Sequence, residues 1–211
     1  QQAIELIQAV EQADSSESLK EAVEALANAR LEQGIPLLIA ALSYNNPGAA
    51  VASVEGLVQL GELAVLPLLN LIDDYNYGGR AWAIRALAGI GDPRALDTLI
   101  EAAETDFAMS VRRAAARGLG NLRWSLLPVQ QVKSCQQRSF KTLVLTCQDG
   151  EWVVRYASVM GLQALAQAVE QNQPDLFSQI KSGLEQIVKI ESDLTVSTRA
   201  QWAASQLQNV T

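Results

Sequence analysis

The sequence predicts an all-α protein in which about six helix pairs stack into a curved solenoid. Hydrophobic residues make up 49% of the 211 residues but aromatic residues only 5%, so Ala, Leu, Val and Ile dominate the apolar part. Ala and Leu are strong helix formers. The chain contains few residues that interrupt helices, with 13 Gly and 6 Pro. An eight-residue segment also recurs along the whole chain, which is typical of repeat proteins. We therefore expect residues 1–211 to form one domain.

The recurring segment is clearest where it begins with arginine. Strong copies occupy residues 80–87, 112–119, 155–162 and 199–206, and weaker copies occupy 19–26 and 50–57. The final position falls at 26, 57, 87, 119, 162 and 206, so the intervals are 31, 30, 32, 43 and 44 residues. Each repeat is expected to contain an apolar first helix, such as 35–42, 64–72 or 94–103, and then the recurring segment as a second helix on the concave face.

An aspartate stands six residues before the leading arginine of each strong copy. The four pairs are Asp74 and Arg80, Asp106 and Arg112, Asp149 and Arg155, and Asp193 and Arg199. Because the spacing recurs in every strong repeat, we interpret these pairs as structural ties between helices.

The two long intervals are explained by longer first helices. Apolar residues keep helical spacing after Pro128 and again after Pro174, and proline is favoured at the start of a helix. Residues 142–146 could also form a strand, but the flanking period favours a helix.

Composition and charge exclude several classes of function. The formal net charge is −7, which argues against a nucleic acid or an anionic membrane as the main partner. No apolar run is long enough to span a membrane. The chain has no histidine, so it cannot build a Ser-His-Asp triad or a His-ligated zinc site, and we expect no metal.

Cysteine usage and the start of the chain indicate a reducing cytoplasm. Cys135 and Cys147 do not make a disulfide framework, and we interpret them as core thiols rather than carriers of a ligand. No secretory signal is visible at Gln1, and the missing initiator Met leaves room for a native N-terminus upstream.

Three segments resemble the E/F-type phycobilin lyases, whose repeats are HEAT-like. These segments are residues 73–96, 118–124 and 151–157, and the similarity extends over nearly the whole chain. The run Asp74-Tyr-Asn-Tyr-Gly78 is the most discriminating part. Within the family, the similarity is greatest to the smaller, F-type subunit of phycocyanobilin lyase.

The resemblance implies a heterodimer with an E-type subunit. Such a pair attaches phycocyanobilin through a thioether bond to a cysteine of the phycocyanin α subunit, so the bilin is a substrate and no tightly bound cofactor is expected. Some members remove or transfer the bilin. A relative that isomerises the bilin uses an Asn-His-Cys motif, which a chain without histidine cannot supply. Two alternatives stay open: a non-catalytic chaperone or degradation adaptor for phycobiliproteins, and a general HEAT scaffold.

Trp82, Arg85 and Arg117 are candidate bilin-binding residues. They belong to the face of the second helices opposite the core residues. Arginine suits the two propionates of a bilin, and the Trp82 indole offers a surface for a pyrrole ring. We expect Arg85 and Arg117 to stand roughly 8–10 Å apart, the distance between packed helices. The same stripe could equally dock a protein partner.

The remaining candidates come from a turn and from the aromatic residues. Tyr75 and Tyr77 interrupt the repeat pattern and are further bilin-binding candidates. Glu55 on the stripe and Asp74 at the turn are candidate carboxylates for protonating the tetrapyrrole. Large groups are rare in this chain, which makes five of them candidates for contact with the partner subunit: Trp124, Trp152, Tyr156, Phe177 and Trp202.

Overall fold

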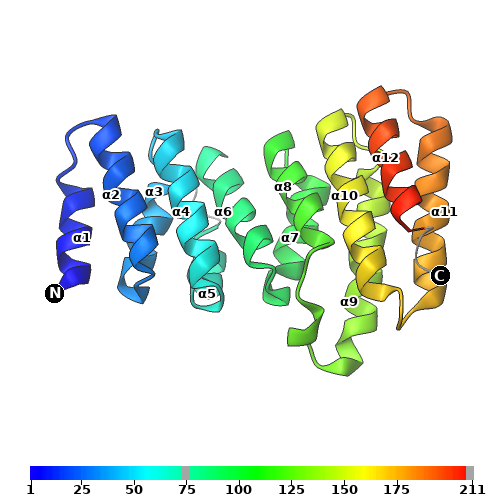
Figure 1. Cartoon of the computed structure of the whole chain (residues 1–211), viewed down its shortest axis with the longest axis horizontal. Helices are drawn as coiled ribbons and strands as arrows, with labels where there is room; N and C mark the ends of the chain where they lie inside the picture. Colours follow the sequence, from blue (N-terminus) through cyan, green and yellow to red (C-terminus); the bar gives the residue numbers. More distant parts are fainter. Residues whose placement is uncertain (73–76, 208–211) are drawn as a thin grey trace. The chain divides into compact units, whose positions relative to one another are not determined.

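The computed structural model of the chain is all-helical in the residues that it describes, which are 1–72 and 77–207 (Figure 1). Twelve α-helices follow one another in these residues, with short 3-10 turns between some of them and no strand. The predicted all-α class with six helix pairs is confirmed. The chain separates into two compact units, residues Gln1–Ala95 (unit 1) and Leu96–Thr211 (unit 2). The predictions of one domain and of a curved solenoid stay predictions.

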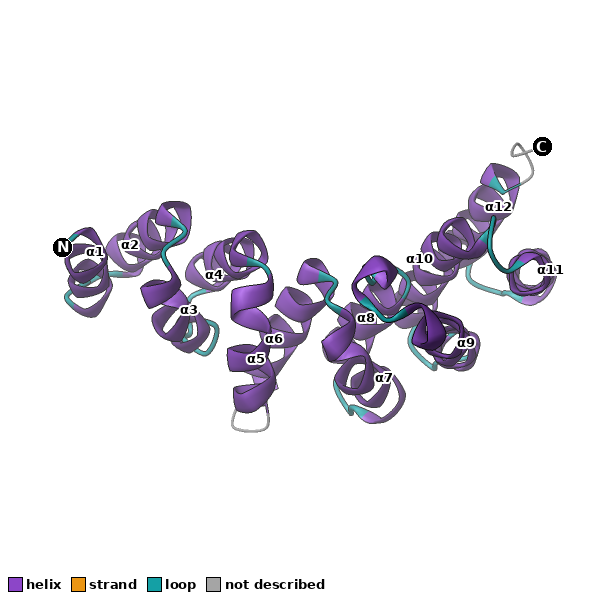
Figure 2. Ribbon diagram, turned by 90° about the horizontal axis from the view of Figure 1, so that it is seen from below, coloured by secondary structure: helices purple, strands orange, loops and turns teal. Residues whose placement is uncertain are grey.

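Unit 1 contains three helix pairs arranged in layers. The second helices α2, α4 and α6 lie side by side, and α3 and α5 pack behind them (Figure 2). The bounds are α1 Gln2–Glu11, α2 Ser16–Ala29, α3 Ile35–Ala41, α4 Pro47–Leu60, α5 Glu62–Leu71 and α6 Tyr77–Ile90.

Polar side chains fix the starts of two second helices in unit 1. Ser15 caps α2, where its hydroxyl accepts from the N–H of Ser18 in a reciprocal capping box. Asn46 caps α4 in the same way by accepting from the N–H of Ala49. Such caps satisfy N–H groups that have no partner inside the helix. Gly61, between α4 and α5, has a φ of +62°, a conformation that favours glycine.

Unit 2 repeats the layered arrangement with longer first helices. The second helices α8, α10 and α12 form one layer, and α7, α9 and α11 form the other (Figure 2). The helix after Pro128 includes residues 142–146, so the helical interpretation of that segment is confirmed. The bounds are α7 Leu96–Thr105, α8 Met109–Leu119, α9 Val129–Thr146, α10 Trp152–Val169, α11 Pro174–Ile190 and α12 Leu194–Gln206.

The core of each unit runs between its two helical layers. The predicted core residues Ala83, Leu87, Ala115 and Leu119 are fully buried. This burial fixes which face of each second helix points outward and therefore which residues are available to a ligand. No helix in the described ranges has the length and apolarity that a membrane span needs.

Candidate functional site

An ion pair connects the second helices α8 and α10 of unit 2. Arg112 on α8 donates from Nε and Nη2 to both carboxylate oxygens of Asp149, which precedes α10, at 2.7 and 3.0 Å. The Asp149 carboxylate also accepts from the N–H of Glu151. Burial alone raises the pKa of Asp149, but the bonds from Arg112 and the Glu151 N–H outweigh it, so the pKa is lowered. The charged pair is therefore stable at neutral pH.

A second ion pair repeats this arrangement one helix further along. Arg155 on α10 donates to both carboxylate oxygens of Glu191, which precedes α12, at 2.8 and 3.0 Å. Glu191 in turn accepts from the N–H of Asp193. The hydrogen bonds from Arg155 lower the pKa of Glu191 despite its burial. Arg112 and Arg155 thus each join one repeat to the next.

The predicted structural role is confirmed for Arg112 and Arg155, but the predicted carboxylate partners are wrong. The hydrogen bond from each arginine to the aspartate six residues before it is accepted by the backbone carbonyl of that aspartate, at 2.9 Å in both cases. The carboxylate partner of each arginine lies in the next repeat, 37 residues later for Arg112 and 36 residues later for Arg155. Sequence spacing within one repeat could not show this partner.

Arg199 does not occupy the position of Arg112 and Arg155. The residues before α8, α10 and α12 that act as N-caps are Ala108, Glu151 and Asp193. Three residues after each cap is a fully buried valine, and four residues after it come Arg112, Arg155 and Ser197. Arg199 lies two residues further along. The last interval of 44 residues is therefore wrong, because the core valines Val154 and Val196 are 42 residues apart.

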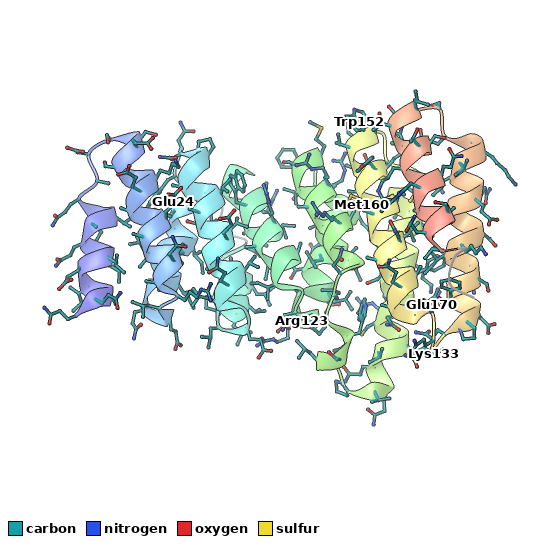
Figure 3. All side chains as sticks on the ribbon, viewed as in Figure 1. Glu24, Arg123, Lys133, Trp152, Met160 and Glu170 are labelled. Carbon is teal, nitrogen blue, oxygen red and sulfur yellow. The ribbon has the colours of Figure 1, made fainter. Side chains whose placement is uncertain are left out.

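The sixth and ninth residues of the second helices form an outward stripe in each unit. In unit 1 the ninth residues are Glu24, Glu55 and Arg85, and in unit 2 they are Arg117, Met160 and Trp202. Figure 3 shows Glu24 and Met160 at mid-helix positions of α2 and α10, with Trp152 at the end where α10 begins. Glu55, Arg85 and Arg117 are exposed. Two of the sixth residues, Ala52 and Ala157, are buried, so the ninth residues provide most of the surface that is available to a ligand.

Trp82 and Arg85 make a cation–π pair on α6. The guanidinium carbon of Arg85 lies 5.3 Å from the Trp82 ring centroid, with Arg85 exposed and Trp82 half-buried. This contact holds a cation beside an aromatic ring. Arg117 belongs to unit 2, and the expected 8–10 Å spacing between it and Arg85 stays a prediction.

Trp82 also lines a pocket of about 310 Å³ at the start of α4 and α6. The other walls include Tyr44, Asn46, Pro47 and Gly79. Tyr44 is 37% exposed, so a second aromatic ring faces this space. Sequence analysis missed Tyr44. The sequence feature that could have indicated Tyr44 as a site residue is its position as a lone tyrosine in the polar loop before Pro47.

Glu55 lines a wider groove of about 530 Å³ between α2 and α4. Lys20 and Glu24 lie on the opposite wall, with Lys20 Nζ 3.8 Å from Glu24 Oε1. Glu55 makes no salt bridge in the described residues. The candidate carboxylate is therefore placed in a groove and is free to meet a positively charged ligand.

The side chains of three other candidates, at and next to the turn before α6, cannot be placed. Asp74 and Tyr75 lie outside the described residues, and for Tyr77 only the backbone, at the first position of α6, is described. Their roles stay predictions.

A second arginine–tryptophan pair occupies the stripe of α12. The guanidinium carbon of Arg199 lies 4.6 Å from the ring centroid of Trp202. Arg199 and Trp202 are the sixth and ninth residues of α12, the positions that Trp82 and Arg85 hold in α6 with the residue types exchanged. Once the register is corrected, both units carry this pair on their last second helix.

The five candidates for partner contact differ in exposure. Trp152 and Trp202 are 45% and 53% exposed, whereas Tyr156 and Phe177 are half-buried. Trp124 is 8% exposed, so its ring packs inside unit 2 and offers little surface to a partner. Trp152 and Trp202 are the members of this group best placed for an interface.

Cys147 offers no activated thiol. Cys135 and Cys147 are both free and half-buried. Burial, with a smaller contribution from the charge of Glu191, raises the pKa of the Cys147 thiol to about 12. Such a thiol stays protonated and is a poor nucleophile at neutral pH. In the residues described, no group of three or more Cys, Asp or Glu side chains could hold a metal ion.

The fold and the repeat pattern define a HEAT-type helical repeat protein. Residues 65–163 match a family model described as HEAT repeats, and residues 19–44 match one described as PBS lyase HEAT-like repeat. A designed armadillo repeat protein shares the fold, with a TM-score of 0.56 at 17% identity.

Closer relatives define the particular family. The chain is 54% identical to the phycocyanobilin lyase subunit beta of Pseudanabaena tenuis, over 97% of this chain and 73% of that protein. It is 52% identical to the phycocyanin alpha phycocyanobilin lyase CpcF of Synechocystis sp., over 97% and 92%. Among solved structures, one from the complex of CpcE and CpcF of phycocyanin lyase from Nostoc sp. PCC7120 has a TM-score of 0.74 and 49% identity, over 81% of this chain and 97% of that chain. The chain belongs to the family of phycocyanobilin lyase beta subunits.

Proposed function

We propose that this chain is the F-type subunit of a heterodimeric bilin lyase. With an E-type partner, it attaches phycocyanobilin by a thioether bond to a cysteine of the phycocyanin α subunit. The observation that carries this proposal is similarity to the CpcF lyase of Synechocystis over 97% of this chain and to a chain of the CpcE–CpcF complex over 81% of it. The bilin is a substrate rather than a resident cofactor, and the free cysteines fit a cytoplasmic protein.

The reaction requires no nucleophile from this chain. The thiol of the acceptor cysteine adds across the ethylidene double bond of the bilin: sulfur bonds to one carbon, the thiol proton is transferred to the conjugated system, and no group leaves. The lyase must hold the bilin in one conformation, exclude water and keep a proton available. These tasks suit a helical repeat protein without histidine, whose stripe presents carboxylates, guanidinium groups and aromatic rings.

The stripe residues of unit 1 divide these tasks by their chemistry. Arg85, held against Trp82, suits a propionate, and the indole with Tyr44 suits a pyrrole ring. Glu55 in the neighbouring groove suits the protonated pyrrole nitrogens. Arg117 supplies a further cation on the stripe of unit 2. The exposed Trp152 and Trp202 are the best-placed candidates for contact with the partner subunit.

Reconstitution tests the proposed function. Phycocyanobilin is mixed with apo-phycocyanin α and this chain, with and without an E-type subunit, and the red-shifted absorbance of the covalent adduct is followed. We expect the adduct only when both subunits are present. If this chain prevents aggregation or promotes degradation of apo-phycocyanin α without adduct formation, the alternative of a non-catalytic chaperone or adaptor holds instead.

A further inference from the structure

Arg199 differs from Arg112 and Arg155, the half-buried arginines on the preceding second helices, because its charge has no matching acid. Arg112 and Arg155 are each neutralised by a carboxylate that accepts two hydrogen bonds. Arg199 donates instead to the neutral side-chain oxygen of Gln163, at 2.6 Å. Within residues 1–72 and 77–207, no carboxylate forms a salt bridge with Arg199.

The guanidinium is enclosed on several sides. Gln163, which is 7% exposed, lies on α10, and the Trp202 ring covers one face of the guanidinium. Arg199 Nη1 is buried and makes no hydrogen bond to any described residue. Burial lowers the pKa of Arg199, and interaction with Tyr156 only partly opposes this effect. A buried N–H of a charged group that lacks an acceptor is costly, and an incoming anion that reaches Nη1 would remove that cost.

The covering group can move. Trp202 is 53% exposed, so a change of its side-chain rotamer meets solvent rather than the core and opens the guanidinium to a ligand. Arg199 and Trp202 also lie on the outward stripe of α12, the same helix face that carries Trp82 and Arg85 on α6.

We propose that Arg199, Gln163, Tyr156 and Trp202 form a carboxylate-binding site in unit 2, in which the carrier of the carboxylate packs against the Trp202 ring. A planar guanidinium donates two parallel hydrogen bonds to a carboxylate, and an indole accepts a flat or apolar group beside it. The carboxylate has two possible sources: a bilin propionate or an acidic side chain of the partner subunit. This inference rests on the proposed function, which supplies both.

Comparison of phycocyanobilin with its dimethyl ester tests the propionate source. Both compounds are titrated against the full chain saturated with the E-type subunit, and binding is followed by bilin circular dichroism. We expect the wild-type chain to bind the free acid about tenfold more tightly than the ester. In Arg199→Gln this ratio should fall to about twofold or less. Arg113→Gln on α8, an exposed cation outside the stripe, is the control and should keep the tenfold ratio.

Calorimetric titration of the chain with the E-type subunit tests the second source, an acidic side chain of the partner subunit. A tenfold weaker complex for Arg199→Gln, with an unchanged complex for Arg113→Gln, would assign the carboxylate to the partner. An unchanged acid-to-ester ratio together with unchanged partner affinity would overturn the site. If the wild-type chain binds neither phycocyanobilin nor its ester, the proposed function and the propionate source are both contradicted. The calorimetric measurement with the E-type subunit then decides whether the site exists.

Thermal melting checks that the variants fold. If Arg199→Gln does not fold, Arg199→Lys, which keeps the charge but loses the planar guanidinium, replaces it.

Discussion

The two units connect neighbouring second helices with different chemistry. In unit 1, Asn46 at the start of α4 donates from its amide to the backbone carbonyl and hydroxyl of Ser16 on α2, at 2.8 and 3.1 Å. In unit 2 the corresponding connections are the Arg112–Asp149 and Arg155–Glu191 ion pairs. The connection at the start of the second helix is thus a neutral amide in unit 1 and an ion pair in unit 2.

This difference separates what packing requires from what electrostatics adds. Both units bury the same stripe of Ala, Leu and Val between their layers, so the fold does not depend on the kind of connection. A neutral hydrogen bond is insensitive to pH, whereas an ion pair depends on the ionisation of its carboxylate. The two units should therefore respond differently to mutation and to acid.

Gly120→Ala should have the largest effect and should act on unit 2. A Cβ at residue 120 would lie 2.0 Å from the backbone oxygen of Gly161, so α8 and α10 would have to separate. We expect a loss of about 3 kcal/mol in the free energy of unfolding, measured in urea. Gly183→Ala on α11 is the control because nothing lies within 4 Å of its added Cβ, and it should stabilise by about 0.5–1 kcal/mol. Equal stability of the two variants would show that α8 and α10 are not in backbone contact.

Glu191→Gln should destabilise unit 2 by a smaller amount. The change leaves the Arg155 guanidinium, which is 17% exposed, without its charged acceptor. We expect a loss of about 1.5–3 kcal/mol, the range for a hydrogen bond to a charged group, measured by urea unfolding. Asp97→Asn removes the exposed ion pair with Arg138 and should change stability by less than about 0.5 kcal/mol. Similar losses in both variants would contradict the importance of burial.

Asn46→Ala tests the neutral connection in unit 1. It removes the cap of α4 and the amide bonds to Ser16 together, for an expected loss of about 1 kcal/mol in urea unfolding. Asn46→Asp keeps the cap but places a carboxylate against the Ser16 carbonyl, so it should not restore stability. Asn45→Ala, at the exposed neighbouring position, is the control. Full stability of Asn46→Asp would show that the cap alone matters.

Acid should weaken unit 2 before unit 1. The folded pKa values of Asp149 and Glu191 lie below their ordinary values of 3.8 and 4.5. The two carboxylates therefore stabilise the folded state fully when the pH is above their ordinary pKa values. This stabilisation is lost as the pH falls towards their lower folded-state pKa values. Between pH 7 and pH 4 we expect a loss of at most about 1 kcal/mol, most of it from Glu191, because pH 4 lies below the ordinary pKa of Glu191 but above that of Asp149.

Hydrogen exchange read by mass spectrometry, after correction for the intrinsic exchange rate, checks where this acid effect falls. Protection should decrease in α8, α10 and α12 and stay constant in α2 and α4. The double variant Asp149→Asn with Glu191→Gln should lose the pH dependence. An equal decrease in both units would contradict the assignment.

Composition and periodicity determined the fold class. Helix-forming Ala and Leu, few Gly and Pro, and a recurring segment required helix pairs, because each pair can bury its apolar face only against its neighbours. The long helices after Pro128 and Pro174 were also predictable, since an apolar stripe at helical spacing continues for 17 or 18 residues. The placement of Trp82 and Arg85 on one face of α6, opposite the core residues, followed from the same register.

Only the tertiary structure decided which charges meet. Arg112 and Arg155 pass over the near aspartate and pair with acids of the next repeat, a choice made by the stacking of repeats rather than by spacing along the chain. The register of α12 was likewise set by burial. Val196, Ala200 and Ala203 must face the core, which moves Arg199 to the outward stripe beside Trp202, whereas the matching of arginine with arginine had placed it two residues away. An apolar pattern tolerates such an offset in sequence, but a packed interface does not, because a shift of two residues turns the helix through more than half a turn.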